Sequence, residues 1–343
     1  MTLNLSREQC SSIKGYAILL ILIHNFFTYA LDIKCNESFY AQENTTAFLN
    51  NIMSESFLGE LFGFIGWIGV PLFFFISGYG LSKKYNNAEV NWFSFLKSHL
   101  FKLWKLLIPI FLIYTLVDVF VFDSKFKLID VFIPQITFIT NIIQHGNNGF
   151  YWNPGAYWFF GAILQFYFIY LILRKLNVKQ LTILFFVFLL IQYGLQYCFN
   201  EEVIRWANHN FIGWGAPFTL GMILAKRHDT TISQRMNIAI IVASIALLCA
   251  SLLTKIFSPL AQIAIVLLFI GLVQFKLIKS SIFLGIISAS IFVIHPLVRL
   301  FIINLSDVKN NLLVTSLCYI IITIVISWVH HKIMTRQKIL TRK

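Results

Sequence analysis

The sequence predicts an all-α protein, a polytopic membrane bundle of about ten spanning helices. Of its 343 residues, 58% are hydrophobic and 12% are charged, against roughly 25% charged residues in an average soluble domain. Apolar runs of the length that a hydrocarbon core requires of a helix recur along the chain. These runs lack the alternating pattern of an outer-membrane barrel, and backbone in lipid must satisfy its own hydrogen bonds, so we interpret them as helices.

Apolar runs and their breakers place the helices at residues 13–31, 57–82, 103–122, 157–173, 181–198, 211–225, 236–254, 258–275, 281–302 and 311–330. No stretch between them is long enough for a separate soluble domain, so we expect one domain over residues 1–343. The first run has no clear cleavage site and is long for a signal peptide. We therefore expect it to remain in the protein as the first membrane helix.

The distribution of Lys and Arg predicts the orientation. With a cytoplasmic N-terminus, the cytoplasmic segments hold 20 of the 27 basic residues, which by the positive-inside rule places both termini in the cytoplasm. The net charge of +13 is then a topology signal and an attraction to anionic membrane lipids, and we expect no nucleic-acid partner. The long external segments are 32–56, 123–156 and 199–210.

The first helix carries an ionisable group, His24, within the apolar run 12–27. Counting from Lys14 at the cytoplasmic boundary, a rise of about 1.5 Å per residue places His24 roughly 15 Å into the membrane. An ionisable side chain at that depth indicates a functional site. The alternative is a neutral imidazole that only bonds to a neighbouring helix.

The second helix contains the run GWIGVPLFFFISGYGLSKKY, residues 66–85. Its small residues would let another backbone or a slender substrate approach closely: Gly66, Gly69, Ser77, Gly78 and Gly80. Plain helix packing is the alternative interpretation.

The third helix begins with HLFKLWKLLIP, residues 99–109. Lys102 and Lys105 are three residues apart, so both ammonium groups project from one face near the membrane surface. They are suited to cytoplasmic phosphate groups, but lysines that merely anchor a helix would give the same pattern.

The external segment before the fourth helix contains two features. FIPQITFITNII, residues 132–143, is too short to span and suggests a re-entrant or interfacial helix. The following stretch is crowded with aromatic residues: Phe150, Tyr151, Trp152, Tyr157, Trp158, Phe159 and Phe160. They indicate either an aromatic belt at the membrane boundary or a platform for the apolar faces of a sugar.

The ninth helix carries His295 and Arg299 one turn apart near its outer end. One of them belongs to a functional site, or both lie at the membrane–water interface. The five cysteines lack metal-ligand spacing, so no metal site is indicated, and Cys35 and Cys198 are either paired or isolated thiols. The motifs GxSxG, HExxH, Walker A and GxGxxG are absent, which removes support for soluble-type hydrolases, proteases, ATPases and dehydrogenases.

Taken in order, these motifs resemble the bacterial acyltransferase family 3, multi-pass membrane acyltransferases that modify surface glycans, lipids and small molecules. The resemblance covers nearly the whole chain, and its spacing from Lys14 to His24 is one residue shorter than is usual in the family. It is carried by Lys14 and His24, the run VPLFFFISGY at 70–79, Lys102 and Lys105 before Pro109, Trp158 and Phe159, and His295 and Pro296.

The resemblance implies a stand-alone acyltransferase of the bacterial inner membrane. Its co-substrate would be acetyl-CoA, with no tightly bound cofactor, and its acceptor a glycan or lipid-linked glycan. His24 would be the general base. The CoA-binding residues would be Lys14, Lys102, Lys105, Ser77, Gly78 and Tyr79. The acceptor-binding residues would be Tyr157, Trp158, His295 and Arg299. A transporter or flippase of lipid-linked glycan remains an alternative, as does a non-catalytic scaffold.

Overall fold

The computed structural model describes residues 4–31, 57, 61, 66–85, 88–125, 127–143, 155–227, 231–275, 281–305 and 311–340. Every regular element in these residues is helical, as predicted. The longer helices are α1 (Arg7–Ala30), α4 (Gly69–Tyr85), α5 (Trp92–Phe120), α7 (Trp158–Leu173), α8 (Val178–Cys198), α9 (Glu201–Asn208), α10 (Phe211–Lys226), α11 (Gln234–Leu253), α12 (Ala261–Gln274), α13 (Ile282–Leu305) and α14 (Leu312–Leu340). The short ones are η1 (Gly66–Ile68), η2 (Leu128–Phe132), α6 (Ile133–Ile136) and η4 (Lys255–Leu260).

Seven helical segments of the described chain are long and apolar enough to cross a membrane. They are α1, α5, α8, α11, α13, α14 and the continuous segment formed by η4 and α12. This confirms a multi-pass helical membrane protein. Helices α7 and α10 are apolar but have 16 residues each, a length of about 24 Å against a hydrocarbon core of about 30 Å. Helix α4 has 17 residues. The structure thus supports seven of the ten membrane spans that the sequence predicts.

Polar caps explain why two helices begin earlier than their apolar runs. Helix α1 begins at Arg7 because Ser6 and Gln9 form a capping box, in which the Ser6 hydroxyl accepts from the Gln9 N–H at 3.1 Å. Helix α5 begins at Trp92 because the Asn91 side chain accepts from the Ser94 N–H at 3.0 Å. Charged residues follow each cap, Arg7 and Glu8 in α1 and Lys97 and Lys102 in α5, which is why the apolar runs alone begin at 13 and 103.

The segment around residues 132–143 forms short helical turns rather than one interfacial helix. Its helical part is η2 followed by α6. The chain then turns at Phe138, whose φ of 61° is in the left-handed region and whose side chain is buried. The indole of Trp104 on α5 donates to the Ile136 carbonyl at 2.7 Å, so these turns are attached to α5.

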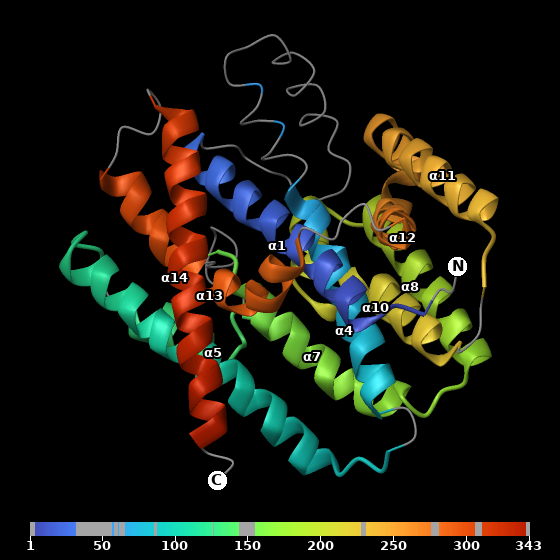
Figure 1. The fold of residues 1–343 in the computed structure, drawn as a ribbon, viewed down its shortest axis with the longest axis horizontal. Coiled ribbons are helices and arrows are strands. Elements are labelled where there is room, and N and C mark those ends of the chain that lie inside the picture. The colour runs from blue at the N-terminus through green and yellow to red at the C-terminus, as the bar shows by residue number, and fades with distance from the viewer. Residues whose placement is uncertain are drawn as a thin grey trace.

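Glycines lie at two close contacts between helices. Helix α1 meets α13 where a Cβ on Gly15 would lie 1.9 Å from the Ser281 carbonyl oxygen. Helix α4 meets α10 through a reciprocal pair: Gly78 lies against the Phe218 carbonyl and Gly221 against the Phe75 carbonyl. Small residues let membrane helices approach this closely. As a result α1 and α4 cross the middle of the bundle, and α11 lies at its edge (Figure 1).

Hydrogen bonds connect several helix ends at one side of the bundle. The Tyr79 hydroxyl near the end of α4 donates to the Asn4 side chain at 2.7 Å. Arg174, after α7, donates to the Tyr85 carbonyl at 3.3 Å, and Lys226 at the end of α10 donates to the Arg174 carbonyl at 2.9 Å. These ends carry many of the Lys and Arg residues that the sequence assigns to the cytoplasm.

Candidate functional site

His24 lies where α1 meets the start of α4. A Cβ on Gly66 would lie 1.9 Å from the Cβ of His24 and 2.7 Å from the Leu20 carbonyl oxygen, so glycine is required at position 66. Gly69 meets the carbonyl of Ala17 on the same side of α1. The histidine itself is half-buried. Its backbone is therefore fixed by direct contact with η1, the turn that leads into α4.

Asn25, the next residue, links α1 to a buried cation on α13. Arg299 is 4% exposed, and its guanidinium donates to the Asn25 side-chain oxygen at 3.2 Å. The same guanidinium lies 3.5 Å from the ring centroid of Tyr29, also on α1. A desolvated cation–π contact is worth about 2 kcal/mol or more, although Tyr29 is half exposed here. Arg299 thus binds α13 to α1 beside His24.

Two side chains bond to backbone carbonyls of α13 in the turn before Pro296. Nδ1 of His295 lies 3.2 Å from the Ile291 oxygen, and the Tyr157 hydroxyl donates to the Val293 oxygen at 2.5 Å. Proline has no N–H, so the carbonyl of Phe292, four residues before Pro296, lacks its helical partner. His295 is completely buried, and its Nε2 has no hydrogen-bond partner in the described chain. A buried polar atom without a protein partner is a candidate contact for a bound water, an ion or a ligand.

Trp158 at the start of α7 lies in a cluster of rings between α4 and α10. Its ring centroid is 4.8 Å from that of His209 and 6.2 Å from that of Trp214, which stacks on Phe74 of α4. The described aromatic residues of this stretch pack inside the bundle, and Tyr157 is 1% exposed. Phe150, Tyr151 and Trp152 lie outside the described residues.

The SGY run of α4 is occupied by protein contacts. Gly78 leaves no space beside it, because the Phe218 backbone fills it. The Ser77 hydroxyl donates to the Phe73 carbonyl of its own helix at 2.8 Å. The Tyr79 hydroxyl bonds to Asn4, and it also accepts from the Leu5 N–H at 2.8 Å. Tyr79 thereby holds the segment before α1 against α4.

The three expected phosphate-binding lysines fall into two places. Lys14 is half-buried on α1, close enough to Cys10 for an electrostatic interaction, and Cys10 interacts in the same way with Tyr79. Lys102 and Lys105 are exposed in the first half of α5. Lys14 and the pair Lys102 and Lys105 thus come from two different helices, α1 and α5.

Helix α13 connects the residues that the structure brings together. Arg299 contacts Asn25, the neighbour of His24. His295 lies one turn before Arg299, and Tyr157 bonds to the carbonyl of Val293, two residues before His295. Trp158 follows Tyr157 directly. The residues expected to bind CoA lie elsewhere, along the first half of α1, the second half of α4 and the first half of α5.

Sequence reasoning missed two polar side chains. Asn25 stands beside His24 in an apolar run, and its polarity was the available signal. His99 is 7% exposed; its Nδ1 lies 2.8 Å from the Phe95 carbonyl, and its ring lies 4.5 Å from that of Tyr167. Phe95 lies one turn earlier on α5, and Tyr167 lies on α7. His99 is therefore packed between these two helices, close to Lys102.

In the described part of the chain, no three His, Cys, Asp or Glu side chains gather as a metal ion would require. Cys10, Cys198, Cys249 and Cys318 form no disulfide with one another. Cys35 lies outside the described residues, so its pairing with Cys198 stays a prediction.

Comparison with known proteins gives one match. A family model described as an acyltransferase domain, that of acyltransferase family 3, matches residues 11–332. The match includes His24, Asn25, Tyr157, His295 and Arg299. No curated protein and no solved structure matches the chain.

Proposed function

Because this chain belongs to acyltransferase family 3, we propose that it is a membrane O-acetyltransferase, which moves an acetyl group from cytoplasmic acetyl-CoA to a hydroxyl of an extracytoplasmic glycan or its lipid-linked precursor. The membrane would be the bacterial inner membrane, with both termini in the cytoplasm. The family and the apolar helices support a membrane acyltransferase. The acetyl group, the glycan and the orientation are our proposal.

The observation that carries this proposal is the setting of His24. It lies on a membrane helix, its backbone contacts Gly66, and the buried Arg299 and His295 lie on the neighbouring α13. A titratable group inside a membrane protein indicates a functional site. In our proposal His24 supplies proton transfer, Arg299 a positive charge and His295 a hydrogen-bonding nitrogen.

We assign His24 the role of general base. Its imidazole takes the proton of the acceptor hydroxyl while the hydroxyl oxygen attacks the thioester carbonyl. The carbon–sulfur bond then breaks, and the CoA thiolate receives the proton from the imidazolium, so the histidine is regenerated. Such proton transfer contributes typically 10²–10⁴ in rate. His295 Nε2 and the Arg299 guanidinium would hold the acceptor, with Tyr157 and Trp158 forming the wall behind them.

For the donor we assign the CoA phosphates to Lys14, Lys102 and Lys105. Ammonium groups bind phosphate as point charges. Ser77 and Gly78 were expected to make room for the pantetheine arm, but the Phe218 backbone lies against Gly78. We therefore propose that the arm passes on another side of α4, and that Tyr79 stabilises the N-terminal segment.

The decisive test uses the full-length protein in lipid nanodiscs with [¹⁴C]acetyl-CoA. Turnover of the thioester, together with glycan O-acetyl content measured by NMR in cells with and without the gene, is expected. A transporter, flippase or scaffold would give neither result. Absence of both thioester turnover and a change in O-acetyl content would refute the proposal.

A further inference from the structure

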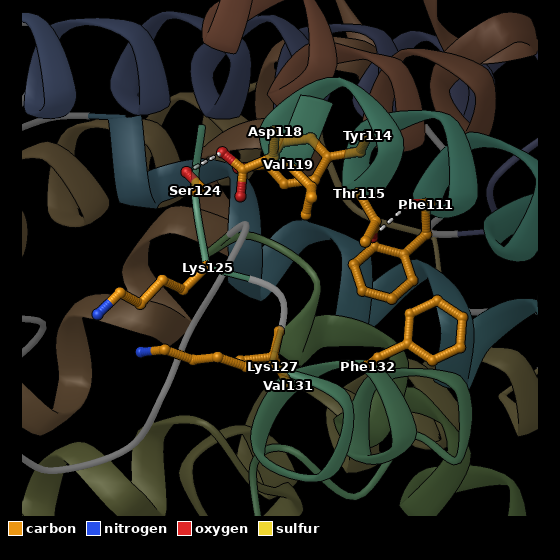
Figure 2. Close-up of a pocket in the computed structure, with 10 residues that line it drawn as sticks. All are labelled: Phe111, Tyr114, Thr115, Asp118, Val119, Ser124, Lys125, Lys127, Val131 and Phe132. Atoms are coloured by element: carbon orange, nitrogen blue, oxygen red, sulfur yellow. Dashed lines mark hydrogen bonds between the residues drawn. The ribbon is translucent and has the colours of Figure 1, made fainter. Parts of the chain in front are cut away.

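A cavity of about 380 Å³ lies beside the last turns of α5, at the end opposite to Lys102 and Lys105. Its walls come from α5 and from the segment that follows it, as Figure 2 shows. Ligand pockets commonly begin at about 300 Å³. The cavity therefore has the volume for a small ligand.

The fold of the chain after α5 builds this cavity. Asp123 has a φ of 53°, in the left-handed region that often ends a helix. The reversal brings Ser124 back to Asp118, where the Ser124 N–H donates to the Asp118 carbonyl and its hydroxyl to the Asp118 carboxylate, both at 3.0 Å. Further on, Phe132 stacks on Phe111 of α5 at 5.6 Å. The cavity is thus closed by fixed contacts at two places.

The lining combines three kinds of side chain. Phe111 and Phe132 supply aromatic rings, and Asp118 with Ser124 supplies hydroxyl and carboxylate groups. Lys125 and Lys127 are exposed, and Figure 2 shows their ammonium groups pointing to the same side. Aromatic rings offer a flat apolar surface, carboxylates accept hydrogen bonds from hydroxyls, and lysines attract oxyanions.

Tyr114 links the cavity to α13 and α1. It lines the cavity, is 6% exposed, and lies close enough to Arg299 and Tyr29 to interact with both electrostatically. Arg299 in turn bonds to Asn25, the neighbour of His24. Tyr114 and Arg299 thus connect the cavity wall to the segment of α1 that carries the candidate base.

We propose that the cavity binds a sugar residue of the acceptor that carries a negative charge. Its apolar face packs on the aromatic rings, its hydroxyls bond to Asp118 and Ser124, and its oxyanion lies at Lys125 and Lys127. The oxyanion is the carboxylate of an acidic sugar or the phosphate of a lipid-linked one. The inference rests on the proposed function, since it takes a saccharide to be the acceptor.

The experiment measures binding by saturation-transfer NMR to the full-length protein in nanodiscs of neutral lipid. The probes are trigalacturonate, glucose 1-phosphate and, as the neutral match, maltotriose. At least one anionic probe is expected to bind more tightly than maltotriose, and which of the two does so identifies the carboxylate or the phosphate. Lys125→Gln is expected to weaken that probe by about fivefold, as loss of an exposed ion pair does.

The matched control is Lys179→Gln, which removes the same charge at an exposed position on α8 and is expected to change no affinity. Phe132→Ala is expected to weaken all saccharides that bind. The proposal is overturned if no probe binds at millimolar concentration, if maltotriose binds as well as both anions, or if Lys125→Gln behaves like the control. Failure of the proposed function is seen separately, as absence of thioester turnover while the binding results hold.

Discussion

Gly66 of η1 lies directly against His24 of α1: a Cβ at position 66 would lie 1.9 Å from the histidine Cβ. No side chain contact in a protein is that short, so any residue other than glycine must push the two helices apart. The candidate base and the small residue that fixes it come from separate segments of the chain.

Gly66→Ala is therefore expected to displace His24 and to reduce acetyl transfer at least tenfold, because small misplacements of a catalytic group are costly. The matched control is Gly80→Ala on α4, where nothing lies within 4 Å of the added Cβ. That change should leave activity intact and stabilise the helix by roughly 0.5–1 kcal/mol. Transfer rate and thermal unfolding in detergent measure both. Equal activity of the two variants would argue against the contact.

His24→Gln should lower the turnover number by about 10²–10⁴ and leave the KM for acetyl-CoA nearly unchanged, because the side chain keeps its polarity but loses its basic nitrogen. His331→Gln, near the end of α14, is the control and should behave as wild type. Both proteins must be present at equal amounts in the membrane. A His24→Gln enzyme within twofold of the wild-type rate would remove His24 from the mechanism.

The sequence predicts the helices well because length and apolarity are set by the membrane itself. It predicts poorly which helices contact one another, because lipid and protein core are both apolar. The sequence therefore does not show which face of a helix contacts lipid and which contacts another helix. Phe74 and Phe168 illustrate this: the first is 0% exposed in the ring cluster, and the second is 53% exposed. Nothing in their local sequence separates them.

The sequence singles out several candidate site residues, but it does not show which of them lie together. His24 and Arg299 stand out as ionisable groups in apolar runs, so chemistry alone singles them out. Their link through Asn25 depends on the crossing of α1 and α13, which the sequence does not specify. Gly78 shows the opposite error: a small residue was expected to make space for a ligand, and the backbone of α10 occupies that space.

Lys102→Gln and Lys105→Gln are expected to raise the KM for acetyl-CoA by several-fold each, because an exposed ammonium contributes up to about 1 kcal/mol to a phosphate contact. The effect should fall with added salt, since exposed charges are screened. Acetyl-dephospho-CoA, which lacks the 3′-phosphate, provides the control substrate. If the lysine variants affect both substrates equally, these lysines do not bind that phosphate.

Tyr79→Phe separates a structural role from donor binding. Its hydroxyl bonds to Asn4 and Leu5, and loss of a buried hydrogen bond costs roughly 0.5–1.5 kcal/mol. We expect a lower thermal midpoint and faster proteolysis of the N-terminal segment, with an unchanged KM for acetyl-CoA at a temperature where the variant is folded. A raised KM with normal stability would return Tyr79 to the donor site.

Tyr157 and Tyr319 form a natural pair for testing buried hydroxyls. Both side chains are at most 1% exposed, but the Tyr157 hydroxyl donates to the Val293 carbonyl, whereas that of Tyr319 has no partner in the described chain. A buried polar group without a partner costs about 1–3 kcal/mol. Tyr319→Phe should therefore raise the thermal midpoint or leave it unchanged, and Tyr157→Phe should lower it. If Tyr319→Phe instead destabilises the protein as much as Tyr157→Phe does, its hydroxyl has a partner such as a bound water. Acetyl transfer measured on the same samples then shows whether the bond between the Tyr319 hydroxyl and that partner is needed for the reaction.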